Sequence, residues 1–139
     1  MNTNEIQISR KITNQLLHLA QISPNLEICG LIGCKNDIPS HCYPIRNAAE
    51  LPRQRFLLDA GQQIAAMTKM RELGEELFAI YHSHPSSPAL PSSKDLELEA
   101  YPNTLHLIIS LNTKGILEMR GFKINQKTSL EVPLIMSDD

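Results

Sequence analysis

Residues 81–95 read YHSHPSSPALPSSKD and join an apolar run to a polar, proline-rich segment. The preceding Leu77 to Tyr81 predicts a buried strand, and side chains two positions apart on a strand share a face, so His82 and His84 point the same way. The prolines keep the chain non-helical until Ser92, and the helix-forming residues that follow place Asp95 in a first turn. If that turn folds back over the strand end, two imidazoles and a carboxylate converge and leave one position for water, as in catalytic zinc sites.

Each half of this stretch also has a structural interpretation. A His-x-His pair often marks a polar strand end, and Ser92 with Asp95 fits a capping box at a helix start. Together the four residues form the pattern His-Ser-His-x(7)-Ser-x-x-Asp. This pattern resembles the signature of the JAMM (MPN-plus, JAB) zinc metalloprotease family, and it matches at every defining position. The combined pattern therefore favours a metal site over the two structural interpretations.

The resemblance implies a role for each residue of the pattern. His82, His84 and Asp95 would bind one catalytic Zn²⁺. Ser92 would donate a hydrogen bond to the oxyanion that forms as the carbonyl becomes tetrahedral, and losing such a donor costs roughly two to three orders of magnitude in rate.

The same chemistry needs a base that takes a proton from water and delivers it to the leaving amine, usually a carboxylate. From the residues alone, the candidates stay open: Glu27, Glu50, Glu72, Glu75 and Glu76. In the JAMM family the base is a glutamate at the start of an early strand, before an apolar, glycine-containing run. Glu27 stands before such a run, which continues to Gly33, so the resemblance implies Glu27.

Composition restricts the class of protein. The 139 residues are expected to form a single domain, 1–139, because 42% are hydrophobic and 20% charged, as in ordinary globular proteins. No apolar run approaches the length of a membrane span, and the first residues lack a secretory signal. A net charge of −2 without a basic cluster argues against nucleic-acid binding. Three cysteines make a poor disulfide framework and suit a reducing compartment, so we expect a cytoplasmic protein.

Hydrophobic periodicity and turn residues predict a mixed β-sheet flanked by helices, an α/β layered domain. The resemblance implies the JAB/MPN version of this architecture, whose layers are broadly like those of cytidine deaminases. Asp59 is the expected N-cap of the second helix. The predicted helices are 8–22, 60–73 and a short one from Asp95, and the predicted strands are 27–34, 38–46, 55–58, 77–81, 105–111, 116–124 and 129–135.

The resemblance to compact prokaryotic JAMM members implies a peptidase or isopeptidase that cuts after the C-terminal Gly-Gly of a ubiquitin-like or sulfur-carrier protein. A sheet edge near the zinc could pair with such an extended tail. Two alternatives stay open: a RadC-like JAB domain in a DNA-related role, and a non-catalytic MPN scaffold, although scaffolds typically lose ligands. A nucleobase deaminase would need His-x-Glu and Pro-Cys-x-x-Cys, which the chain lacks. The leaving group and the oligomeric state are not determined by the sequence.

Overall fold

The computed structural model describes residues 5–97, 104–111 and 117–138. Its centre is a six-stranded sheet with the strand order β3-β2-β4-β5-β6-β7. The strands are β2 (Cys29–Lys35), β3 (Ile38–Ile45), β4 (Glu76–His84), β5 (Leu105–Ser110), β6 (Glu118–Asn125) and β7 (Thr128–Val132). The β4–β5 pair is parallel, whereas the other pairs in the sheet are antiparallel. The predicted mixed sheet is thus confirmed.

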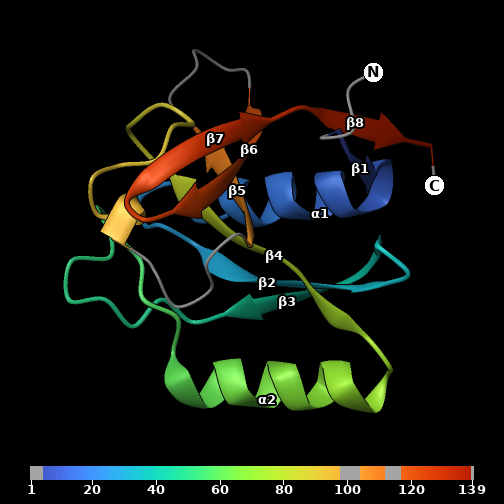
Figure 1. Cartoon of the computed structure of the whole chain (residues 1–139). Helices are drawn as coiled ribbons and strands as arrows, with labels where there is room; N and C mark the ends of the chain where they lie inside the picture. The colour runs from blue at the N-terminus through green and yellow to red at the C-terminus, as the bar shows by residue number, and fades with distance from the viewer. Residues whose placement is uncertain (1–4, 98–103, 112–116, 139) are drawn as a thin grey trace.

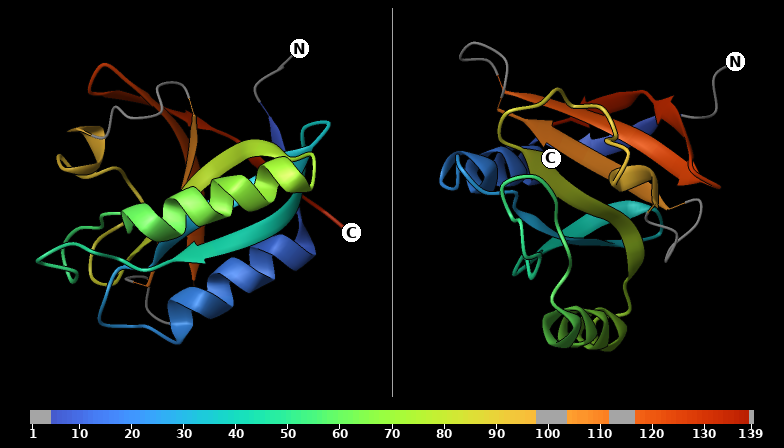
Figure 2. Two further views of the ribbon diagram at one scale, coloured as in Figure 1. Left: turned by 90° about the horizontal axis from the view of Figure 1, so that it is seen from below. Right: turned by 90° about the vertical axis from the view of Figure 1, so that its left-hand side faces the viewer.

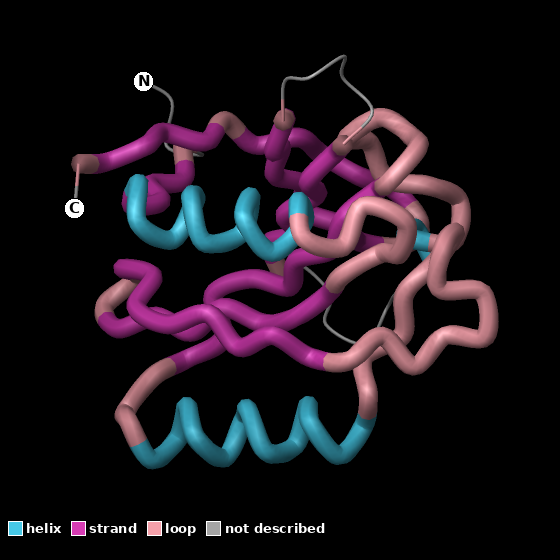
Figure 3. Tube along the Cα trace, turned by 180° about the vertical axis from the view of Figure 1, so that it is seen from behind, coloured by secondary structure: helices cyan, strands magenta, loops and turns pink. Residues whose placement is uncertain are grey.

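Two helices cover the sheet from opposite sides (Figures 1 and 3). The first, α1 (Arg10–Gln21), buries Ile12, Leu16 and Ala20 against β4 and β5. The second, α2 (Ala60–Glu72), begins at the predicted N-cap, where Asp59 accepts a hydrogen bond from the Gln62 amide at 3.0 Å. The sheet is twisted, so that β6 and β7 are tilted relative to β2 and β3 (Figure 2).

Both ends of the described chain differ from the prediction. Residues Ile6–Ser9 form a strand, β1, so α1 begins at Arg10 and not at residue 8. The predicted strand 129–135 is divided at Pro133 into β7 and β8 (Leu134–Ser137), and β8 pairs with β1 in a separate parallel sheet. This pairing joins the two ends of the chain, which no local pattern indicates.

Two smaller differences concern loops. Segment 55–58 is not a strand, because its pairing is limited to one bridge between Leu58 and Asn47. The helix predicted from Asp95 is a single 3₁₀ turn, η1 (Asp95–Glu97), in the described part. Its continuation over 98–100 and the turns expected near 101–103 and 112–115 lie outside the described residues.

Strand β4 positions the site. Its residues from Ala79 to His84 are all buried. Ala79 and Tyr81 pack into the core beneath α1, so the alternation of a strand turns Ile80, His82 and His84 toward the opposite face. The loops after β3 and after β4 lie at the same end of the molecule as the C-terminal end of β4 (Figure 1, left), where His84 is the last residue of the strand. No helix in the described part of the chain is long and apolar enough to cross a membrane.

Candidate metal centre

Three donor atoms converge at the end of β4. The Nε2 atoms of His82 and His84 lie 3.1 Å apart, and each lies 3.1 Å from Oδ2 of Asp95. Ligands of a tetrahedral zinc ion with bonds of about 2.0 Å lie about 3.3 Å from one another. The three atoms therefore fit one face of a tetrahedral zinc site, and the two imidazoles and one carboxylate suit that metal.

The His84 ring is held with its Nε2 turned inward. Its Nδ1 lies 2.7 Å from the carbonyl oxygen of Pro88. A carbonyl oxygen can only accept, so Nδ1 donates. Burial alone would lower the pKa of His84, but Asp95 and the Pro88 carbonyl raise it, so without a metal Nε2 can carry the proton that it shares with Asp95. In the neutral ring with Nδ1 protonated, Nε2 presents its lone pair to a metal in place of that proton. The loop that presents Pro88 is held in turn by Ser110, whose hydroxyl donates to the Ser87 carbonyl at 2.8 Å.

His82 is fixed by packing. It is fully buried, and its ring stacks on Phe56 with the centroids 4.3 Å apart and an angle of 20° between the planes. Burial lowers the pKa of His82, which favours the neutral ring that a metal ligand requires. Sequence reasoning missed Phe56, because its contact with His82 depends on the path of the loop after β3.

Asp95 is both a capping residue and a candidate ligand. The amide of Ser92 donates to Oδ2 of Asp95 at 2.9 Å, and the amide of Asp95 donates to Oγ of Ser92 at 3.1 Å. Burial alone would raise the pKa of Asp95, but hydrogen bonds with His82 and His84 outweigh it and hold the pKa far below its usual range. The capping box therefore places an ionised carboxylate against the two imidazoles. Oγ of Ser92 acts here as an acceptor, so its hydrogen remains available for the predicted oxyanion contact.

Glu27, two residues before β2, faces the same centre. One of its carboxylate oxygens and the ligand nitrogens of His82 and His84 all lie within 4.8 Å of one another. Its side chain is buried, and Oε1 has no hydrogen-bond partner among the described residues. Burial, opposed by His84 and assisted by Asp95, raises the pKa of Glu27 to about 7. This carboxyl can therefore gain and lose a proton near neutral pH, beside an Asp95 carboxylate that stays ionised.

The register of β2 on β4 explains this placement. Cys29 pairs with His82, so the same antiparallel register brings Glu27 opposite His84. At the intervening pair the Ser83 amide donates to the Ile28 carbonyl at 3.0 Å, and the Ile28 amide donates to Oγ of Ser83 at 2.9 Å. The serine between the two histidines thus ties the start of β2 to β4.

The other glutamates raised by the sequence are placed elsewhere. Glu50, Glu72 and Glu76 are exposed. Glu75 is buried, but it lies just before β4, at the end opposite His84, and accepts hydrogen bonds from its neighbours Ser40, His41 and Tyr43. Among the five candidates, Glu27 is the one beside the two histidines.

Cys29 also lies on this side of β2 but is not equipped to bind metal. Its Sγ donates to the Ile45 carbonyl at 3.3 Å. Burial, with a smaller contribution from Glu27, raises the pKa of the thiol to about 12. The group thus stays a protonated thiol at neutral pH.

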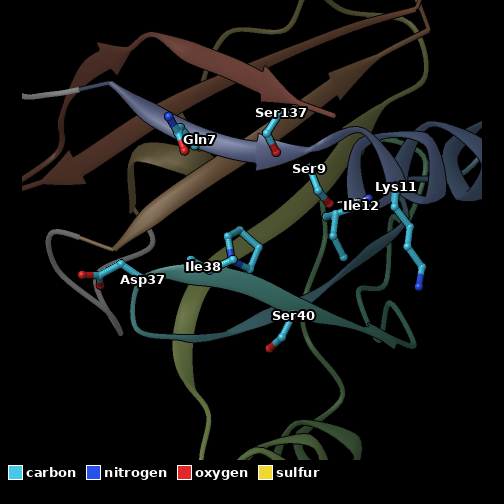
Figure 4. A pocket seen from close by; sticks show the side chains of 9 residues that line it. Gln7, Ser9, Lys11, Ile12, Asp37, Ile38, Ser40 and Ser137 are labelled. Atoms are coloured by element: carbon cyan, nitrogen blue, oxygen red, sulfur yellow. Dashed lines mark hydrogen bonds between the residues drawn. The ribbon is translucent and has the colours of Figure 1, made fainter. Parts of the chain in front are cut away.

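A hollow of about 330 Å³ lies between the start of α1 and the start of β3 (Figure 4). Two of the hydroxyl groups that line it already take part in hydrogen bonds of the fold, since Ser9 caps α1 by accepting from the Ile12 amide and Ser40 donates to Glu75. The hollow is at the end of β2 remote from Glu27, and it contains none of the converging donors.

The fold and the centre define a layered α/β domain with a His-His-Asp donor set and a buried glutamate. Residues 9–123 match the family model for prokaryotic homologues of the JAB domain. The chain belongs to this family, a prokaryotic branch of the JAMM proteins, as the sequence pattern predicted.

Three similar proteins illustrate the relationship. A desampylase from Haloferax volcanii is 30% identical over 89 residues, which cover 63% of this chain and 64% of that protein, slightly less than two thirds of its length. A CysO-cysteine peptidase from Mycobacterium tuberculosis is 29% identical over 110 residues, covering 78% of this chain and 75% of that protein. The solution structure of protein DSY2949 from Desulfitobacterium hafniense superimposes with a TM-score of 0.84 at 32% identity, covering 96% of this chain and 94% of that one.

Proposed function

We propose that this chain is a zinc-dependent peptidase or isopeptidase that cuts after the C-terminal Gly-Gly of a ubiquitin-like or sulfur-carrier protein. The observation that carries the proposal is the convergence of two histidine nitrogens and the Asp95 carboxylate, 3.1 Å apart, beside the Glu27 carboxyl. The names of the desampylase and the CysO-cysteine peptidase supply the substrate class.

In this proposal His82, His84 and Asp95 hold one Zn²⁺. When bound, zinc supplies Lewis acidity that polarises a carbonyl oxygen and makes water a better nucleophile. The fixed rings and the capped aspartate present the donors in place, so little reorganisation is needed on binding.

Glu27 is the proposed general base and then general acid. Its carboxylate takes a proton from the water that adds to the glycine carbonyl carbon, and it passes that proton to the leaving nitrogen as the C–N bond breaks. A pKa of about 7 suits both transfers near neutral pH. Ser92 is the proposed donor to the oxygen that becomes negative at the tetrahedral stage.

We also place this activity in the cytoplasm, because Cys29, Cys34 and Cys42 are free thiols and suit a reducing compartment. The proposed partner is a carrier protein with a Gly-Gly tail, with no role for nucleic acid or membrane.

The test is a cleavage assay with zinc-loaded protein. Carrier proteins ending in Gly-Gly would be supplied with a C-terminal cysteine, a peptide or a lysine-linked partner, and mass spectrometry would locate each cut. We expect cleavage after the last glycine, reduced to a small residual rate in Glu27→Gln but retained in Glu72→Gln, an exposed glutamate at the end of α2. Absence of cleavage in every conjugate, with zinc bound, would contradict the proposal and favour the scaffold or DNA-related alternative.

A further inference from the structure

Asn47 lies two residues beyond β3 and uses every hydrogen-bonding position of its carboxamide. Its Nδ2 donates to the carbonyl oxygens of Glu27 and Arg55, each at 3.0 Å. Its Oδ1 accepts from the amides of Ala49 and Leu57, each at 3.0 Å. A carboxamide offers two donors and two acceptor positions, so all four are filled, and all four partners are main-chain groups.

One of these partners, Glu27, belongs to the candidate centre, and two others lie on either side of a residue that packs on it. The Glu27 main chain is bonded on both sides by the loop after β3, because its amide donates to the Pro52 carbonyl at 2.7 Å and its carbonyl accepts from Asn47. Arg55 and Leu57 flank Phe56, whose ring stacks on His82. One side chain thus joins the backbone of the glutamate to the segment that packs on a candidate ligand.

The Glu27 carboxyl depends on its backbone for its position. Oε1 has no hydrogen-bond partner among the described residues, so no hydrogen bond within the described chain fixes that oxygen directly. The bonds to β4 begin one residue further along, between Ile28 and Ser83, and none of them involves the Glu27 main chain itself. The contacts that the loop makes with the Glu27 main chain are therefore the nearest constraint on where the carboxyl points.

We propose that Asn47 is a positioning residue that fixes the Glu27 main chain through its Nδ2–H bond and so keeps the carboxyl facing His82 and His84. The catalytic consequence rests on the proposed function. The structural consequence, an ordered Glu27 main chain, does not depend on the proposed function.

Two variants distinguish the effect of the two Nδ2–H hydrogen bonds from the effect of the whole Asn47 side chain. Asn47→Asp keeps an oxygen that accepts from Ala49 and Leu57 but removes both donor bonds. Asn47→Ala removes all four bonds without adding charge, so it serves if the Asp variant does not fold. Asn14→Asp makes the same chemical change at an exposed position on α1 and is the matched control.

The first measurement is amide hydrogen exchange by NMR on the zinc-loaded protein, which needs no activity. In Asn47→Asp we expect exchange of the Glu27 amide to rise about tenfold or more, whereas the Ala49 and Leu57 amides keep their protection. In Asn47→Ala all three amides should exchange faster. Unchanged protection of Glu27 in both variants would overturn the proposal.

The second measurement is a double-mutant comparison in the cleavage assay. Mispositioning of a catalytic group costs on the order of 100-fold, so Asn47→Asp should lower kcat about 10- to 100-fold with KM and zinc content little changed. In a Glu27→Gln background the same substitution should cause less than about a twofold further loss, since Asn47 acts through Glu27. Equal losses in both backgrounds would show a merely structural role and overturn the proposal. If the wild-type chain cleaves nothing, the proposed function fails, and the exchange result alone decides the positioning proposal.

Discussion

Gly30→Ala should destabilise the protein, because the Tyr81 ring and the Tyr43 carbonyl occupy the space that a side chain at Gly30 would need. A methyl group there would press on the hydroxyl of Tyr81 and would lie 2.5 Å from both Tyr81 Cζ and the Tyr43 carbonyl oxygen. Ordinary carbon contacts are about 3.5–4.0 Å. The Tyr81 ring is fully buried, and the Tyr43 carbonyl belongs to β3, paired with β2, so neither can easily move away.

The magnitude follows from two opposing effects. Overpacking a filled core costs about 1–3 kcal/mol or more, whereas replacing glycine with alanine in a strand recovers about 0.5–1 kcal/mol of backbone entropy. We expect a net loss of about 2 kcal/mol in the free energy of unfolding. Urea titration followed by far-UV circular dichroism measures it, since the chain has no tryptophan for fluorescence.

Gly61→Ala is the matched control for this prediction. Gly61 lies in the first turn of α2, and the nearest atom to an added methyl group there is Asp59 Oδ2 at 3.7 Å. Alanine should therefore be neutral or stabilise by up to about 1 kcal/mol. Adding Tyr81→Phe to Gly30→Ala should recover only part of the loss, because Cζ and the Tyr43 carbonyl remain. If Gly30→Ala were as stable as the wild type, the close packing of Tyr81 and the Tyr43 carbonyl against Gly30 would be refuted.

Three further predictions concern charged groups. Removing zinc with a chelator should lower the Tm, because a metal that binds only the folded state stabilises it by about 4 kcal/mol at 1,000 times its Kd. Calorimetry should show no difference in Tm between chelator-treated and zinc-loaded Asp95→Asn. An equal loss of Tm in the wild type and in Asp95→Asn would contradict Asp95 as a ligand. In chelator-treated protein, folding raises the pKa of Glu27 from 4.5 to about 7, so the folded state binds more protons than the unfolded state between these values. Raising the pH from 5 to 8 should therefore cost the wild type more stability than Glu27→Gln in urea titrations, and parallel pH profiles would contradict the burial of this carboxyl. Glu75→Gln should lower the free energy of unfolding by about 2–3 kcal/mol, because Ser40, His41 and Tyr43 lose a buried carboxylate acceptor. Zinc content measured by mass spectrometry should stay at the wild-type value, since Glu75 is at the far end of β4, and loss of the metal would refute that separation.

Local patterns predicted the features that depend on neighbouring residues. The mixed sheet, the Asp59 cap and the shared face of His82 and His84 each follow from periodicity or from contacts within a few positions. The capping box at Ser92 and Asp95 was equally local. In contrast, β1 and β8 lie at opposite ends of the described chain, and their pairing has no local signal.

The contacts around the candidate metal centre likewise could not be predicted from local sequence patterns. Phe56 reaches His82, and Asn47 reaches Glu27, only because the loop after β3 folds back over the start of β2. No spacing in the sequence encodes the path of that loop, since Asn47 joins the main chain of Arg55, within the loop, to that of Glu27, in a distant segment.

By itself the sequence predicted that His82, His84 and Asp95 converge, because one strand end and the capped turn that follows it present them, and the structure brings the three together. It left the choice of glutamate open among five candidates, and only the family resemblance implied Glu27. Only the tertiary structure shows which of the five glutamates lies beside the two histidines. Glu27 and His84 are far apart in the sequence. The antiparallel register of β2 on β4, in which Cys29 pairs with His82, places Glu27 opposite His84. The same β4 leaves Glu75 bonded at its other end, because a strand of this length separates its two ends by more than any side chain can span.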